Sequence, residues 1–171
     1  DGIPILFPSS WGGALSIYNA KNIGGLEFFT GGYSAKYSQS MSGILDLKTK
    51  DGNPYKQAGF IDINLTELNS LYNVPLTGGT SNIVASFRRT YYDLFAPVFI
   101  KSKGQSFSLP YLQSFESKYI YRINKTDKLK FGIHYFNDGM DLPLNIFSDD
   151  AKGVFTYDNS TVLVNTEWLN E

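Results

Sequence analysis

The chain has 171 residues, a formal net charge of −1 and no cysteine. The lack of cysteine excludes disulfide frameworks, thiolate metal sites and cysteine nucleophiles. The lack of any basic run argues against a nucleic-acid-binding surface, which needs clustered lysine and arginine.

Aromatic residues are abundant and charged residues are scarce, at 16% and 18% of the chain. Soluble domains contain about a quarter charged residues. The composition is typical of strands that have one face toward lipid and aromatic ends, although an aromatic-rich soluble β-sandwich remains an alternative. No run of about 18 apolar residues occurs, so no transmembrane helix is expected.

The first 52 residues predict a compact module. Residues 15–20 indicate either a helical turn or a short strand. Residues 26–30 predict a strand that ends at a glycine pair, and residues 43–50 alternate apolar and polar side chains, as a half-buried strand does. The Asp-Gly-Asn-Pro sequence at residues 51–54 then predicts an exit from the module.

The rest of the chain predicts a series of amphipathic strands. The expected strands are residues 60–66, 82–92, 111–123, 129–135 and 161–169. Two connections are short, Thr-Gly-Gly-Thr at 77–80 and Asn-Lys-Thr-Asp-Lys at 124–128, whereas those at 95–110 and 137–158 are long. Short turns at one end and long loops at the other are typical of outer-membrane barrels.

Four segments together resemble one family. Residues 1–4 are Asp-Gly-Ile-Pro, residues 23–31 contain an Ile-x-x-Leu-Glu strand followed by Gly, and residues 43–50 read Gly-Ile-Leu-Asp-Leu-Lys-Thr-Lys. Residues 86–94 contain Arg-Arg-Thr-Tyr. In this order and spacing, the chain resembles a TonB-dependent outer-membrane receptor over essentially its whole length.

The resemblance implies a mainly β fold and a fragment of a larger protein. Residues 1–52 would be the C-terminal part of the plug domain, and residues 53–171 the first strands of an antiparallel transmembrane barrel. About five of the roughly 22 strands of such a barrel would be present. Five strands cannot close a barrel, and open edges in lipid are costly.

The same resemblance implies active import of a scarce nutrient across the outer membrane of a Gram-negative bacterium. The nutrient would be a siderophore, cobalamin, a glycan or a peptide. The implied partners of this integral membrane protein are a TonB-type energy-coupling protein in the periplasm, outer-membrane lipid and lipopolysaccharide, the nutrient ligand and a surface lipoprotein. The alternatives are a soluble β-sandwich that serves as a binding or adhesin module, and a passive outer-membrane porin.

No residue pattern indicates an enzyme, a cofactor or a metal site. The single histidine, His134, lies on the polar face of a predicted strand, where a structural role is the expected one. Asp149, Asp150 and Asp158 could hold Ca²⁺, but a solvated loop is the more ordinary interpretation.

Two aromatic residues fall at apical loop positions of the implied plug, Trp11 and Tyr37. Their rigid faces and polar atoms suit a siderophore or a sugar ring, and packing against the barrel wall is the alternative.

Consecutive strand residues point to opposite faces, so Arg88 and Arg89 should diverge. We expect Arg88 to enter the lumen and contact plug carboxylates, and Arg89 to reach the headgroup level, near a lipopolysaccharide phosphate. The apolar residues expected to meet lipid are Ile61, Ile63, Phe87 and Phe131.

Overall fold

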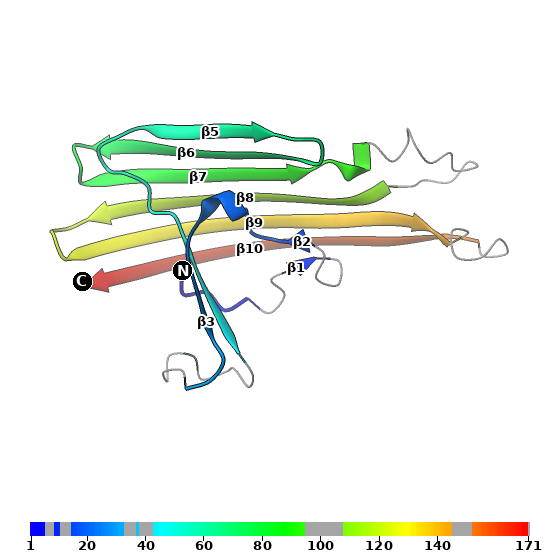
Figure 1. Ribbon diagram of the computed structural model, residues 1–171, viewed down its shortest axis with the longest axis horizontal. Helices are drawn as coiled ribbons and strands as arrows, with labels where there is room; N and C mark the ends of the chain where they lie inside the picture. The colour runs from blue at the N-terminus through cyan, green and yellow to red at the C-terminus, as the bar shows by residue number, and fades with distance from the viewer. Residues whose placement is uncertain are drawn as a thin grey trace.

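The computed structural model describes residues 1–5, 9–10, 15–32, 37, 43–94, 108–144 and 152–170. This part of the chain is mainly β and forms three antiparallel sheets, one of six strands and two of two strands (Figure 1). None of its helices is long and apolar enough to cross a membrane.

The strands of the six-stranded sheet lie between residues 58 and 170. Its strands are β5 (Ala58–Ile63), β6 (Glu67–Thr77), β7 (Ser81–Thr90), β8 (Ser108–Arg122), β9 (Asp127–Pro143) and β10 (Val154–Asn170). Each strand pairs with the next one in sequence, so the sheet is an up-and-down meander. Within the described residues the sheet is open, because β5 and β10 each pair on one side only.

The sequence predicted five of these strands, and the structure adds a sixth, β6. Asn69, Asn73 and Pro75 obscured its alternation, because polar residues and a proline are unusual on the covered face of a strand. The asparagines are tolerated because their side chains find hydrogen-bond partners. Pro75 is tolerated because it lies at a register shift in the β6–β7 ladder.

The two faces of the large sheet differ in polarity. We call the face that carries Phe87, Phe131 and Val164 the outer face, and the face that carries Arg88 and Glu116 the inner face. Over most of their length, the register places odd-numbered residues of β5, β7, β8 and β9 and even-numbered residues of β6 and β10 on the outer face. The outer face is rich in exposed apolar side chains, including Ile61, Ile63, Tyr72, Phe115, Tyr119, Phe131, Ile133, Val162, Val164 and Trp168.

Within the first 50 residues, the described segment from residue 16 to residue 22 lies against the inner face. The first 50 residues contain β1 (Ser9–Ser10), β2 (Leu15–Ser16), the short 3-10 helix η2 (Ala20–Asn22), β3 (Ile23–Phe29) and β4 (Ile44–Thr49). The β3–β4 hairpin crosses the strand direction of the large sheet (Figure 1). Its two strands match the predicted ones to within a few residues, and the undecided segment at 15–20 proves to be a short strand followed by bends.

A small apolar cluster fixes the segment from β2 to η2 on the sheet. Ile17 packs with Leu112 of β8 and Phe136 of β9, and all three are buried. The ring of Tyr18 meets the Phe136 ring edge-on, with 5.5 Å between centroids. This contact is worth about 0.5–1.5 kcal/mol beyond the area it buries.

Candidate functional site

The polar inner face, with the N-terminal segment on it, is the candidate functional site. Among the described residues, buried polar and charged side chains outnumber buried hydrophobic ones. That is the reverse of an ordinary soluble core, in which buried polar groups are the exception. The buried interior of this molecule is therefore a polar interface between two parts of one chain.

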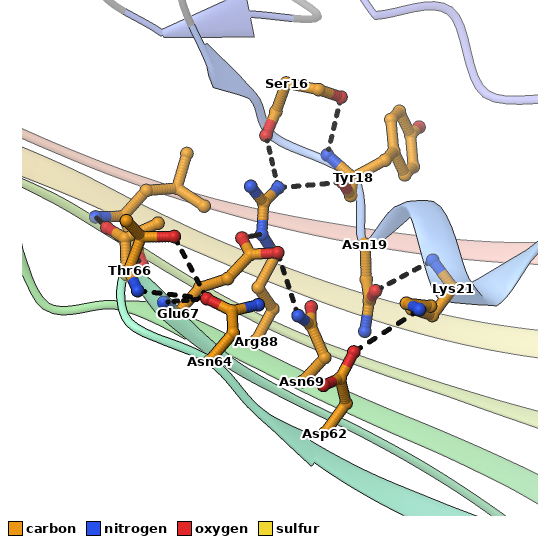
Figure 2. A network of polar contacts seen from close by, with 12 residues as sticks. Ser16, Tyr18, Asn19, Lys21, Asp62, Asn64, Thr66, Glu67, Asn69 and Arg88 are labelled. Carbon is orange, nitrogen blue, oxygen red and sulfur yellow. Dashed lines mark hydrogen bonds and ion pairs between the residues drawn. The ribbon is translucent and has the colours of Figure 1, made fainter.

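Arg88 connects the sheet to β2 and the residues after it. Its Nε donates to Glu67 Oε2 at 2.8 Å, across the β6–β7 ladder. Its Nη1 donates to the carbonyl oxygens of Ser16, at 2.9 Å, and Tyr18, at 3.1 Å. Figure 2 shows the guanidinium between the Glu67 carboxylate and the β2 backbone, with Asn69 donating to the same carboxylate. The planar fork of arginine suits this role, because one group satisfies three acceptors.

Glu116 of β8 holds η2. Its carboxylate accepts the Asn22 side-chain amide at 2.5 Å and the Asn19 backbone N–H at 3.3 Å. Glu116 is 2% exposed, and no cation forms an ion pair with it among the described residues. Burial, reinforced by the Glu116 charge, raises the pKa of Tyr18 to about 12, so this phenol stays neutral at any physiological pH.

Lys118 and Lys130 hold the end of the N-terminal segment. Lys118 Nζ donates to Asp51 Oδ1 at 3.0 Å and to the Thr49 carbonyl at 2.9 Å, and it pairs with Asp1 at 3.3 Å. Lys130 Nζ lies 2.6 Å from Asp51 Oδ2. Burial alone would raise the pKa of the Asp51 carboxyl, but the two lysines outweigh it and leave the pKa below its ordinary value.

Asparagines on β6 and β7 fix the linker between β4 and β5, which we define as residues 51–57. Asn82 donates to the Asp51 carbonyl at 2.8 Å and to Asn73 Oδ1 at 2.9 Å. Asn73 in turn donates to the carbonyls of Asn53 and Lys56, both at 2.7 Å. Polar side chains of the sheet thus replace the strand partners that this irregular backbone lacks.

These contacts hold and orient the N-terminal segment on the sheet. No group of three or more His, Asp or Glu side chains that could hold a metal ion occurs among the residues the structure describes. Comparisons of the chain with protein-family models, with curated proteins and with solved structures found no match. The function must therefore be argued from the geometry.

Of the two predicted ligand-binding residues, Tyr37 is among the described residues and Trp11 is not. Tyr37 donates its hydroxyl to Asp46 Oδ2 at 2.8 Å, which raises the pKa of the phenol, and its ring lies 5.8 Å from that of Phe29. Tyr37 therefore contacts the β3–β4 hairpin, and its role toward a ligand stays a prediction.

The predicted arginines point to opposite faces, with partners that differ from those expected. Arg88 contacts the N-terminal segment through carbonyl oxygens, and its carboxylate partner, Glu67, belongs to the sheet. Arg89 pairs with Asp93 at 2.7 Å and lies 5.7 Å from the ring centre of Tyr111. Its charge is balanced within the chain, so the geometry requires no external phosphate.

Sequence reasoning missed the residues that grip η2 and the linker. Glu116 and Lys118 were placed on the polar face of a predicted strand, but nothing distinguished them from solvated charges. The sequence feature that could have identified them is their spacing. Two opposite charges two residues apart in the middle of a long strand lie on the same face of the sheet. Such a pair in a strand with an apolar opposite face indicates a covered polar face.

Proposed function

We propose that this chain is part of a plugged outer-membrane transporter of the TonB-dependent type. Residues 53–171 would form part of the barrel wall and residues 1–52 part of the plug. The protein would import a scarce nutrient, of the siderophore, cobalamin, glycan or peptide class. A TonB-type partner in the periplasm would supply the energy.

One observation carries this proposal: the sheet is apolar where it is exposed and polar where it is covered. On the outer face Ile61 is 73% exposed and Val164 is 59% exposed, whereas Glu116 and Lys118 on the inner face are buried. Water would penalise the exposed apolar face, and lipid would not. A soluble β-sandwich buries its apolar faces against each other, whereas the apolar outer face of this sheet is exposed within the described residues.

Strand length supports a membrane wall. A transmembrane strand needs about 9–11 residues when tilted. β6 has 11 residues, β7 has 10, and β8, β9 and β10 have 15, 17 and 17. The unpaired edges of β5 and β10 favour further strands in the assembled wall, because an open edge in lipid leaves backbone groups unsatisfied.

The covered inner face favours a plugged transporter over a passive porin. A porin lumen is filled with water, whereas here Arg88, Glu116 and Lys118 are all engaged by residues 1–51. The attachment consists of hydrogen bonds and ion pairs rather than a continuous apolar core. Water can substitute for such contacts, which suits a segment that must be displaced and then return.

The experiment that tests the wall assignment compares two adjacent residues of β10 in the full-length protein. Val162 faces outward and is 64% exposed, and Leu163 faces inward beside the apolar cluster. This chain has no cysteine, so Val162→Cys and Leu163→Cys can each carry a fluorophore once any cysteine elsewhere is removed. The labelled proteins are reconstituted in brominated lipid, which quenches fluorophores in contact with acyl chains.

Strong quenching at position 162 with little at 163 is the expected result. Equal and weak quenching at both positions would contradict a lipid-facing wall. Transport is tested separately, by asking whether cells that lack the protein, or lack the energy-coupling partner, lose uptake of the same nutrient. Uptake that is independent of the partner would favour a porin instead.

A further inference from the structure

His134 occupies an unusual place beneath the N-terminal segment. It is 4% exposed, and neither ring nitrogen makes a hydrogen bond of good geometry, although the Asn165 side chain lies close enough to act on the ring. On the inner face it lies directly across the β8–β9 ladder from Glu116, and the two line one small hollow with Asn22. Directly opposed residues have Cβ atoms about 4.5–5.5 Å apart, so the imidazole and the carboxylate are neighbours.

The groups that face His134 offer no free carboxylate oxygen to a positively charged imidazole ring. Glu116 already uses its two carboxylate oxygens for Asn19 and Asn22. Lys118 lies on the adjacent row of β8 and is held by Asp51 and Asp1, and Lys50 also lines the hollow. Lys118 and the amino group of Asp1 are the positive charges that act on the ring from β8 and the N-terminal segment.

The other neighbours of His134 are uncharged. Phe136 stacks on the ring, with 6.3 Å between ring centres. Asn165 Oδ1 and His134 Nε2 both approach Gly132, where an added Cβ would lie 2.2 and 3.1 Å from them. An imidazolium there would lie near the Lys118 ammonium and the amino group of Asp1, and its one carboxylate neighbour, Glu116, is engaged with η2.

We propose that His134 is an acid-sensitive release for the η2 part of the N-terminal segment. Histidine gains its charge between pH 8 and pH 5. A charged ring beneath η2 is satisfied in one of two ways: Glu116 turns to it and leaves Asn22, or the segment lifts and admits water. Either change loosens Asn19 and Asn22. Because Arg88 still holds Ser16 and Tyr18, the loosening is confined to η2 and its flanks.

This inference does not depend on the proposed function, because it requires only that the segment lie on the inner face. The test is hydrogen exchange by mass spectrometry on the full-length protein in detergent, at pH 8.0 and pH 5.5. Exchange rates are corrected for the intrinsic effect of pH. Peptides covering residues 17–24 report on η2, and peptides covering β7 serve as the internal reference.

We expect protection of residues 19–22 to fall about tenfold at pH 5.5 in the wild type, because protonation of the buried ring favours the released segment. His134→Gln, which has no titratable ring, should keep its protection at both values. His134→Phe should do the same, and it guards against a folding defect peculiar to glutamine. The proposal is overturned if the wild type keeps full protection at pH 5.5, or if both variants lose protection as the wild type does.

Discussion

Lys118 of β8 and Asp51 of the linker form a 3.0 Å ion pair across the boundary between the N-terminal segment and the sheet. Water has little access to the Lys118 ammonium, because the side chain is only 6% exposed. The ammonium also donates a hydrogen bond to the Thr49 carbonyl. This pair therefore marks where the N-terminal segment meets the six-stranded sheet.

Replacing Lys118 by methionine should loosen this junction. The variant keeps most of the side-chain volume and removes three charge-assisted contacts, and the expected loss is about 1.5–3 kcal/mol of unfolding free energy. Urea denaturation of the full-length protein in detergent measures it. Lys48→Met is the matched control, because the exposed Lys48–Glu27 pair, at 3.8 Å, should contribute under about 0.5 kcal/mol. Equal losses in the two variants would show that the Lys118 contacts are unimportant.

Stability should depend on acid pH through Asp51. The pKa of its carboxyl is lower in the folded protein than the ordinary value of 3.8, so the folded state binds the proton less readily than the unfolded state. The stabilisation is therefore complete above about pH 4 and disappears as the pH falls through the folded value. Asp51→Asn should be less stable at pH 6 and should lose less on acidification to pH 3. An identical pH profile for the variant and the wild type would assign the acid sensitivity to other carboxyls.

Shortening Arg88 should release the β2 part of the segment while leaving the sheet intact. Arg88→Lys keeps the charge but cannot reach Glu67 and two carbonyls with one planar group. We expect protease cleavage between residues 15 and 19 to accelerate about tenfold, which corresponds to about 1.4 kcal/mol. Arg122→Lys, which removes a contact to Asn82 on β7, is the control and should leave this cleavage unchanged.

Much of the fold could be predicted because the outer face is apolar. Alternation of apolar and polar residues identified β5, β7, β8, β9 and β10, and the Thr-Gly-Gly-Thr turn between β6 and β7 was recognised from its glycines. β6 was missed because its inner face carries Asn69 and Asn73. Asn73 is satisfied only with the linker backbone in place, and Asn69 only through the Glu67 carboxylate that Arg88 also contacts.

The candidate site was less predictable than the strands. The divergence of Arg88 and Arg89 follows from the strand period alone. The acceptors of Arg88 do not, since backbone carbonyls are present at every residue and only the path of β2 selects those of Ser16 and Tyr18. The hydrogen bond from Asn22 to Glu116 could not be predicted from local sequence either, because 94 positions separate the two residues.

Gly52 should be the most sensitive glycine of the linker. Its φ is +67°, and an added Cβ would lie 2.1 Å from Asn73 Oδ1. Gly52→Ala should therefore cost more than the roughly 1–2 kcal/mol of a left-handed conformation, because Asn73 must also move and release Asn82. Gly32→Ala is the control that measures the cost of the left-handed backbone conformation alone, since φ there is +68° and no atom lies within 4 Å of the added Cβ. Equal destabilisation of the two variants in urea would show that Asn73 adjusts freely.

A charged residue on the outer face should distinguish lipid from water. Ile61 is 73% exposed, so in a soluble protein Ile61→Arg should change stability by no more than about 0.5 kcal/mol. In a membrane wall the same change should cost about 2–4 kcal/mol near the midplane.

Ile123→Arg is the control, because Ile123 adjoins the short β8–β9 turn, is 51% exposed and would lie near the interface, where the cost is about 0–1 kcal/mol. Refolding of each full-length variant into lipid vesicles, followed by urea titration, measures the difference. A large penalty at position 61 with almost none at 123 requires a lipid-facing strand, and near-zero values at both would make the outer face an aqueous or protein-binding surface.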